Sequence, residues 1–324
     1  MTLQRLTQAA TLAFTLSLAG AAGAQVMLKV GHASAADSPL GQSMQAFCAQ
    51  VLKGSKGRYR CAGTGASQGA QAELADALQQ GTLDVAHVSA TGLAGKVPEI
   101  GIVEVPFLFR DLAHARKALA GPLGQELIAK LQAHKIVGLA WTEQGFRHVS
   151  NSQRALVKPA DFKGLKLRTQ DSAPMQAGFK ALGAEVVSLP FEQVYGALEK
   201  GTLHGQEHVI ATMDAAKFFR VQKHVTLTNH AYVPALLAVS ATTWDKASAA
   251  DRKVFAAAAA KAAKVHRAAA GREHRQHLAV MKRNGVKVVA KVSQPAFRQA
   301  VDGAYADFAK TYGAERLAAV QALK

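Results

Sequence analysis

The sequence has few aromatic residues and no basic run, and both shortages argue against a nucleic-acid-binding protein. Phe, Trp and Tyr make up 6% of the 324 residues. The 39 lysines and arginines give a formal net charge of +17, but they are scattered singly and no zinc-finger spacing accompanies them. Segments that bind nucleic acid combine basic runs with such motifs or with stacking aromatic residues. We therefore expect no nucleic-acid partner, and interpret the charge as a basic surface that favours anionic solutes or a membrane face.

A long hydrophobic run is missing once the N-terminus is set aside. The N-terminal "MTLQR" supplies a positive charge, "LTQAATLAFTLSLAG" an apolar core, and "AGA" a small-residue cleavage site. This pattern predicts a signal peptide over residues 1–24, cleaved after Ala24. No later segment offers eighteen uncharged apolar residues, the length that spans a bilayer. We expect a soluble, periplasmic protein.

Cysteine is also scarce, with Cys48 and Cys61 as the two examples. In an oxidising compartment the two could form a disulfide. The alternative is a pair of buried free thiols.

Strand and helix patterns alternate along the chain and predict an α/β fold. In the first half, the order strand, helix, strand, helix, strand is expected over 27–32, 39–53, 58–62, 70–80 and 82–88. In the second half, the same order is expected over 165–168, 172–182, 185–187, 191–200 and 202–208. Such alternation indicates a parallel sheet with flanking helices.

A short internal echo indicates two similar halves. "ADALQQGTLDVAHV" (75–88) and "YGALEKGTLHGQEHV" (195–209) share a helix end, Gly-Thr-Leu and a strand. Gly81 and Gly201 suit the position after a helix, where a left-handed backbone favours glycine. We expect two α/β lobes that face each other.

The alanine-rich segment 247–285 predicts a long helix, because alanine is the best helix former and Asn284-Gly285 supplies a stop. As one helix over about 248–284 it would be a strut along both lobes, with a bend at Gly271. The alternative is two ordinary helices that break there. A strand (285–290) and a final helix (295–312) are expected to follow.

Two short motifs offer catalytic or metal chemistry, and neither is favoured. "GASQG" (65–69) matches the G-x-S-x-G nucleophile elbow around Ser67. However, four residues separate the preceding strand from Ser67, and no oxyanion-loop glycine cluster stands out. "HGQEH" (204–208) matches a zinc-binding pattern that works on a helix. On a strand its two histidines lie about 13 Å apart and cannot share one metal. We expect no enzyme activity, no cofactor and no metal.

Two arginines stand where strands end. Arg168 closes the predicted strand in "DFKGLKLRTQDSAP", and Arg147 follows the apolar strand "KIVGLAW". Open α/β sheets bind ligands just beyond the carboxyl ends of their strands. Solvated surface charges are the alternative. Together the two could form a fork for one carboxylate, with charge-assisted hydrogen bonds worth roughly 1.5–3 kcal/mol each.

The sequence resembles the periplasmic solute-binding proteins of TRAP (tripartite ATP-independent periplasmic) transporters, of the DctP type. The similarity runs through "LKVGHASAADSPLGQSMQAF", "GTLDVAHVS", "VEVPFLFRDLAHA", "GFRHVSNS", "DFKGLKLRTQDS" and "SLPFEQVYGALEKGTLHGQEH". It implies a two-lobed fold of the type II-like binding-protein kind, a long helix shared by both lobes, and a small organic acid in the cleft between them. It also implies the membrane permease subunits of such a transporter as partners.

The resemblance assigns roles to residues of this sequence. The arginine of "GLKLR", Arg168, is expected to clamp a carboxylate, with Arg147 assisting. The remaining cleft-lining positions expected from the same motifs are Gln71, Ser89, Asp171 and Phe191. After "GQE" the family usually has Asn-Pro, whereas this sequence has His208 and no proline. His208 is therefore the expected specificity element. A histidine at this position would allow a bulkier or more anionic ligand, or pH-sensitive binding.

The expected organisation is discontinuous. One lobe would comprise residues 25–144 plus about 234–275, and the other 145–233 plus about 276–324. We expect a monomer, since no coiled-coil heptad is present. Two alternatives to transport remain at this point, a secreted serine hydrolase that uses Ser67 and a scavenging or sensing protein without a transporter.

Overall fold

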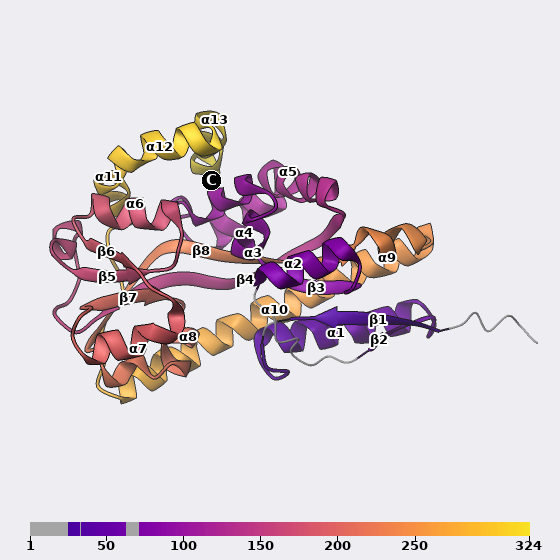
Figure 1. Cartoon of the computed structure of the whole chain (residues 1–324), viewed down its shortest axis with the longest axis horizontal. Coiled ribbons are helices and arrows are strands. Elements are labelled where there is room, and N and C mark those ends of the chain that lie inside the picture. Colours follow the sequence, from indigo (N-terminus) through magenta and orange to yellow (C-terminus); the bar gives the residue numbers. More distant parts are fainter. Residues whose placement is uncertain (1–24, 33, 63–70) are drawn as a thin grey trace, which may run out of the picture.

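A nine-stranded mixed sheet runs through both halves of the molecule (Figure 1). The computed structural model describes residues 25–32, 34–62 and 71–324. The strands follow the spatial order β2-β1-β3-β8-β4-β7-β5-β6, and β9 pairs with β8. Their bounds are β1 Val26–Gly31, β2 Tyr59–Ala62, β3 Val85–Ser89, β4 Ile136–Asn151, β5 Lys166–Thr169, β6 Glu185–Ser188, β7 Gly205–His208, β8 His224–Ser240 and β9 Lys287–Val289.

Two long antiparallel strands connect the halves. The expected parallel pairings hold for β1 with β2 and β3, and for β5 with β6 and β7. Strands β4 and β8, however, pair antiparallel along almost their whole length. The sequence predicts only the first part of β4, the apolar strand "KIVGLAW", because Gly145, with φ of 102°, and three register shifts interrupt the alternation of β4. The β4–β8 ribbon is therefore the sheet's continuous link between the lobes.

Helices cover both halves of the sheet (Figure 1). The α-helices are α1 Pro39–Gly54, α2 Gln71–Gln80, α3 Ala90–Ala94, α4 Leu112–Ala120, α5 Pro122–Leu131, α6 Ala173–Ala181, α7 Phe191–Glu199, α8 Ile210–Ala215, α9 Ala241–Lys246, α10 Ala249–Arg283, α11 Gln294–Ala300, α12 Asp302–Tyr312 and α13 Ala314–Ala322. Short 3-10 helices are η1 Pro98–Glu104, η2 Gln132–His134, η3 Pro159–Phe162 and η4 Phe218–Arg220.

Helix α10 is a single strut. It begins at the cap Ser248, whose side chain accepts from Asp251 N–H (3.2 Å), and continues through Gly271 without interruption. The alternative of two helices is therefore wrong. Its alanine face packs against α1 and the β4 strand, and its far end reaches α8 in the other lobe (Figure 1).

Each lobe has its own apolar cluster, and a third cluster extends across both lobes. Residues from β1, β3, α1 and the first half of α10 surround Phe47 and Phe255. Residues from α7, α8 and the end of α10 surround Phe218 and Met281. The largest cluster extends from α2 and η1 to the C-terminal helices. These helices contact both sides: Tyr305 donates to the Pro106 carbonyl (2.8 Å), and α12 also packs on α6.

Two local features of the sequence have direct counterparts in the structure. Cys48 on α1 and Cys61 on β2 form a disulfide, with Cα atoms 5.7 Å apart. Gly81 and Gly201, the repeated glycines, follow α2 and α7 with φ of 72° and 70°. The matched left-handed positions let each helix turn into its strand at the same point of the two lobes.

Candidate functional site

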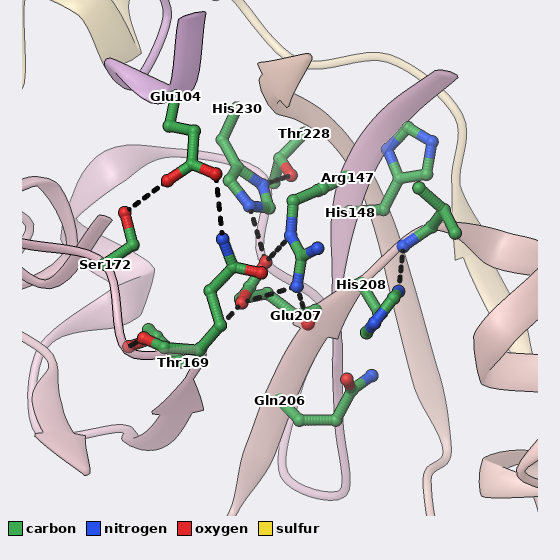
Figure 2. Close-up of polar contacts among 12 residues, drawn as sticks. Glu104, Arg147, His148, Thr169, Ser172, Gln206, Glu207, His208, Thr228 and His230 are labelled. Carbon is green, nitrogen blue, oxygen red and sulfur yellow. Dashed lines mark hydrogen bonds and ion pairs between the residues drawn. The ribbon is translucent and has the colours of Figure 1, made fainter. Parts of the chain in front are cut away.

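Strand β7 lies between β5 and β4, and its carboxyl end pairs with the last part of β4. In register, Arg168 on β5 lies beside Gln206 on β7, and His148 on β4 lies beside His208. Arg147 directly precedes His148, and Glu207 directly precedes His208. Their side chains therefore gather on one face, and Figure 2 shows Arg147 and Glu207 pointing toward each other there. The sheet brings Arg147, Arg168 and His208, which are distant in sequence, to one edge.

A buried network fixes Arg147. Its Nε donates to Glu207 Oε2, and its Nη2 donates to Glu207 Oε1 (3.0 Å) and to the Glu207 carbonyl (3.1 Å). His230 Nε2 lies 3.2 Å from Glu207 Oε2, and its Nδ1 lies 2.7 Å from Thr228 Oγ1 (Figure 2). The backbone N–H of Gln170 donates to Glu207 Oε1 (3.3 Å). Glu207 is thus the centre of the network.

Electrostatics set the protonation states of this network. Burial alone would raise the pKa of Glu207, but the Arg147 charge and the hydrogen bonds from His230 and Arg147 outweigh it and hold that pKa well below its usual range. Burial lowers the pKa of His230, against the opposing effect of Glu207. A neutral His230 that donates from Nε2 to Glu207 and accepts at Nδ1 from the Thr228 hydroxyl satisfies every contact.

Arg168 is a buried cation with spare donors. Its residue is 5% exposed, its Nε donates to the Leu189 carbonyl (2.9 Å), and its guanidinium lies 6.0 Å from the ring centroid of Phe191. Within residues 25–32, 34–62 and 71–324, no carboxylate pairs with it. Burial lowers its pKa, and Arg147 acts in the same direction against Glu207. A desolvated guanidinium with free N–H groups is ready to accept an anion.

His208 and Phe191 form a wall beside this cation. Their ring centroids are 5.6 Å apart, and Phe191 is 41% exposed. His208 Nδ1 accepts from the Val209 N–H (2.9 Å). Burial, then Arg147, lowers the pKa of His208 well below its usual value, and Arg168 adds to this. The imidazole is therefore neutral near pH 7, with its proton on Nε2 as a single donor.

The remaining predicted positions divide between the lobes. Gln71 and Ser89 meet in the first lobe, where Gln71 Oε1 accepts from the Ser89 N–H (2.7 Å) and Ser89 Oγ caps α3. Asp171 is exposed in the loop after β5, and its carboxylate accepts from Gln176 at 3.5 Å. Contacts among the described residues do not join Asp171 to Arg168. Ser67 lies outside the described residues.

Sequence patterns missed Glu207, His230 and Glu104. Glu104 on η1 accepts from Ser172 (2.8 Å), from Gln170 (3.4 Å) and from Thr91 (2.6 Å), so it ties the first lobe to the loop after β5 (Figure 2). In the sequence, Glu104 stands out as an acid inside the apolar run "VEVPFLF", and this pattern could have indicated a polar role for it. His230 had none, because its position depends on the β4–β8 register.

A cavity of about 350 Å³ lies between the lobes. Segment 34–40 after β1 lines one wall, and segment 209–215 after β7 lines the opposite wall. His266, Glu273 and His277 of α10 close one end. His208 directly precedes Val209, the first residue of the second wall.

Known proteins share this architecture. The family model of the bacterial extracellular solute-binding proteins, family 7 (DctP), matches residues 30–311. The chain belongs to this family. The predicted family and two-lobed fold are thereby confirmed. The family is periplasmic, and it is a family of solute-binding proteins. Within the described residues, none of the helices combines the length and the apolar character needed to cross a bilayer.

Three relatives illustrate the match. A TRAP periplasmic solute-binding protein from Polaromonas sp. JS666, solved with D-erythronate bound, is 43% identical, with a TM-score of 0.83 over 93% of this chain and 99% of that one. The 2,3-diketo-L-gulonate-binding periplasmic protein YiaO of Escherichia coli K12 is 37% identical over 74% of each chain. The sugar acid-binding protein DctPAm from Advenella mimigardefordensis, solved with galactonate, is 31% identical, with a TM-score of 0.79 over 92% and 97%.

Proposed function

We propose that this protein captures a small monoanionic hydroxy acid between its lobes and delivers it to the membrane permease of a TRAP-type transporter. The observation that carries the proposal is Arg168, a buried guanidinium that no carboxylate of the described residues neutralises. A buried charge is unfavourable unless it is paired. A ligand carboxylate is the partner that this position lacks.

The charge balance supports a single carboxylate. Glu207 neutralises Arg147, and His208 and His230 are neutral near pH 7. Arg168 therefore provides the one uncompensated positive charge of this cluster. Arg147 keeps Nη1 for an assisting hydrogen bond, since Glu207 takes its Nε and Nη2.

Hydroxyl groups on the ligand fit the rest of the site. His208 offers a neutral Nε2 donor, and Phe191 offers an apolar wall. Relatives bind the hydroxy acids D-erythronate and galactonate. We infer a ligand of this aldonate class, with the carboxylate on Arg168 and a hydroxyl near His208, where Gln71, Ser89 and Asp171 are the further cleft-lining candidates.

The lobes close around the ligand by moving about the β4–β8 ribbon and α10. We place the lobe boundaries in β4 between 144 and 145 and in β8 near 233–234, where Gly145 and the register shifts interrupt regular pairing. A ligand favours the closed form only by binding it more tightly than the open form. The N-terminal 24 residues, outside the described residues, direct the chain to the periplasm as a cleaved signal peptide.

Arg168→Ala is expected to weaken binding of D-erythronate or galactonate at least about tenfold, because it removes charge-assisted hydrogen bonds. Calorimetric titration of both acids, and of the corresponding neutral polyols, measures the effect. Arg220→Ala, at an exposed arginine on η4, is the matched control. Unchanged affinity in the Arg168 variant, or equal affinity for acid and polyol, would contradict the proposed function.

His208→Asn is expected to change selectivity more than overall affinity. The variant exchanges an imidazole donor for a shorter amide. The order of binding affinities among acids of different chain length should therefore change, with individual affinities shifting by up to about tenfold. Competition of a series of aldonates of increasing chain length, followed by calorimetry, measures this order. An identical ranking in both proteins would remove His208 from specificity.

A further inference from the structure

Helix α10 extends along both lobes (Figure 1), and one of its faces carries a row of exposed cations. We call these seven residues the α10 stripe: Lys253, Lys261, Lys264, Arg272, Arg275, Lys282 and Arg283. Lys253, Lys264 and Arg275 recur every 11 residues, which is close to three turns, so they stand in a straight line. All seven fall within a sector of about 120° and span roughly 45 Å along the axis.

The stripe is not neutralised by its surroundings. The two acids of α10 face elsewhere, since Asp251 is buried against Arg58 and Glu273 lines the interlobe cavity. In the part of the chain that the structure describes, none of the seven cations forms an ion pair, and Lys261 donates to the neutral Gln50 (3.3 Å). Ordinary protein surfaces intersperse both signs of charge. A single-sign row of this length is therefore a candidate interaction surface.

The residues between the cations define the mode of contact. Exposed positions of the same sector are alanines, such as Ala257 and Ala268, so the stripe has no large apolar side chain that could insert into another body. A straight, rigid helix matches a flat and extended partner. Contact must then be peripheral, electrostatic and sensitive to salt.

We propose that the α10 stripe docks the protein on a bilayer that contains anionic phospholipid. The family is periplasmic, and a bilayer surface is an extended anionic body in that compartment. Each Lys or Arg near such a surface adds to the attraction. Docking would hold the protein close to the membrane in which its permease resides.

The proposed orientation leaves the cleft open to solution. His266, Glu273 and His277, which line the interlobe cavity, lie on the opposite side of α10 from the stripe. A protein lying on its stripe turns the cavity away from the lipid. Docking and ligand capture therefore occur together, and affinity for a bound acid does not change with vesicles present.

The test uses vesicles and two variants with equal loss of charge. The stripe variant is Lys253→Gln, Lys264→Gln, Arg275→Gln and Lys282→Gln. The control variant is Lys180→Gln, Lys200→Gln, Arg220→Gln and Lys291→Gln, four exposed cations dispersed over other elements. Glutamine is a good helix former, so α10 should persist, and circular dichroism with thermal unfolding checks this.

Co-sedimentation with phosphatidylglycerol/phosphatidylcholine vesicles should retain the parent and the control variant, while the stripe variant binds at least tenfold more weakly. Binding should vanish on pure phosphatidylcholine and in high salt. Equal losses in the two variants would show a net-charge effect and overturn the docking surface. A second outcome would also overturn the proposal: the parent protein does not bind anionic vesicles, but it binds protein-containing membranes and the stripe variant does not. The partner of the stripe would then be an acidic protein instead of lipid. Ligand calorimetry on the same samples keeps this outcome separate from the proposed function.

Discussion

Glu207→Ala is expected to lower the free energy of unfolding by about 3–5 kcal/mol, the cost of leaving a buried charge without its partner. Glu207 is 0% exposed and Arg147 is 4% exposed, so water cannot readily replace the lost carboxylate. His230 and the Gln170 N–H lose an acceptor at the same time. Urea unfolding followed by circular dichroism measures the change.

Two further variants separate charge pairing from packing. Glu207→Gln keeps the size of the side chain but removes its charge, and it should remain strongly destabilised. The double variant Arg147→Met with Glu207→Leu removes both charges and should recover much of the loss, because apolar pairs of similar volume replace buried ion pairs well. Glu199→Ala on the exposed end of α7 is the matched control. A loss below about 1 kcal/mol in Glu207→Ala, as at a surface ion pair, would contradict a buried network.

The place of Arg168 at the end of a strand could be predicted from sequence because the information is local. Alternation of Leu165, Lys166 and Leu167 indicates a strand, and the ligand-binding edge of such a sheet lies beyond its carboxyl end. The structure ends β5 at Thr169, within one residue of the expected position. Helix α10 was predictable for a similar reason, since its alanine content and its stop are both local.

The Glu207 network could not be predicted in the same way. His230 approaches Glu207 because β4 and β8 shift register between Arg147 and Val149, and Asn229 takes φ of 46° beside that shift. A register shift depends on tertiary packing and has no simple sequence pattern. In the sequence, Glu207 belongs only to the motif "HGQEH", for which strand geometry excludes a shared metal. Its role as the partner of Arg147 required two strands that sequence patterns did not join.

Lowering the pH from about 7.5 to about 5.5 is expected to destabilise the protein strongly. Burial lowers the pKa of His266 to about 4, and lowers the pKa values of His87 and His148 well below the usual value. Neighbouring histidines act in the same direction on the last two: His266 and His32 on His87, and His274 on His148. The folded protein therefore keeps these imidazoles neutral while the unfolded chain binds protons below its pKa of about 6.5.

The pH range and the size of the stability loss follow from these lowered pKa values. Stability is constant well above pH 6.5 and falls as the pH drops, and for His266 the fall continues to about pH 4. At pH 5.5 His266 alone contributes a loss of about 1.4 kcal/mol, and His87 and His148 add losses of the same sign. The depressed pKa of Glu207 acts in a separate window, because its stabilisation is lost only below the usual carboxyl pKa of about 4.3.

Thermal unfolding midpoints between pH 5.5 and 7.5 measure this slope, and His266→Gln should reduce it. Glutamine cannot titrate, yet it can still accept from the Glu143 N–H that His266 Nδ1 faces at 3.4 Å. His134→Gln, at a partly exposed histidine on η2, is the matched control substitution. A midpoint that stays constant across this range would mean that the buried imidazoles are protonated in the folded state. The neutral His208 assigned to the ligand site depends on the same physical cause, so that result would also return a charged histidine to the cleft.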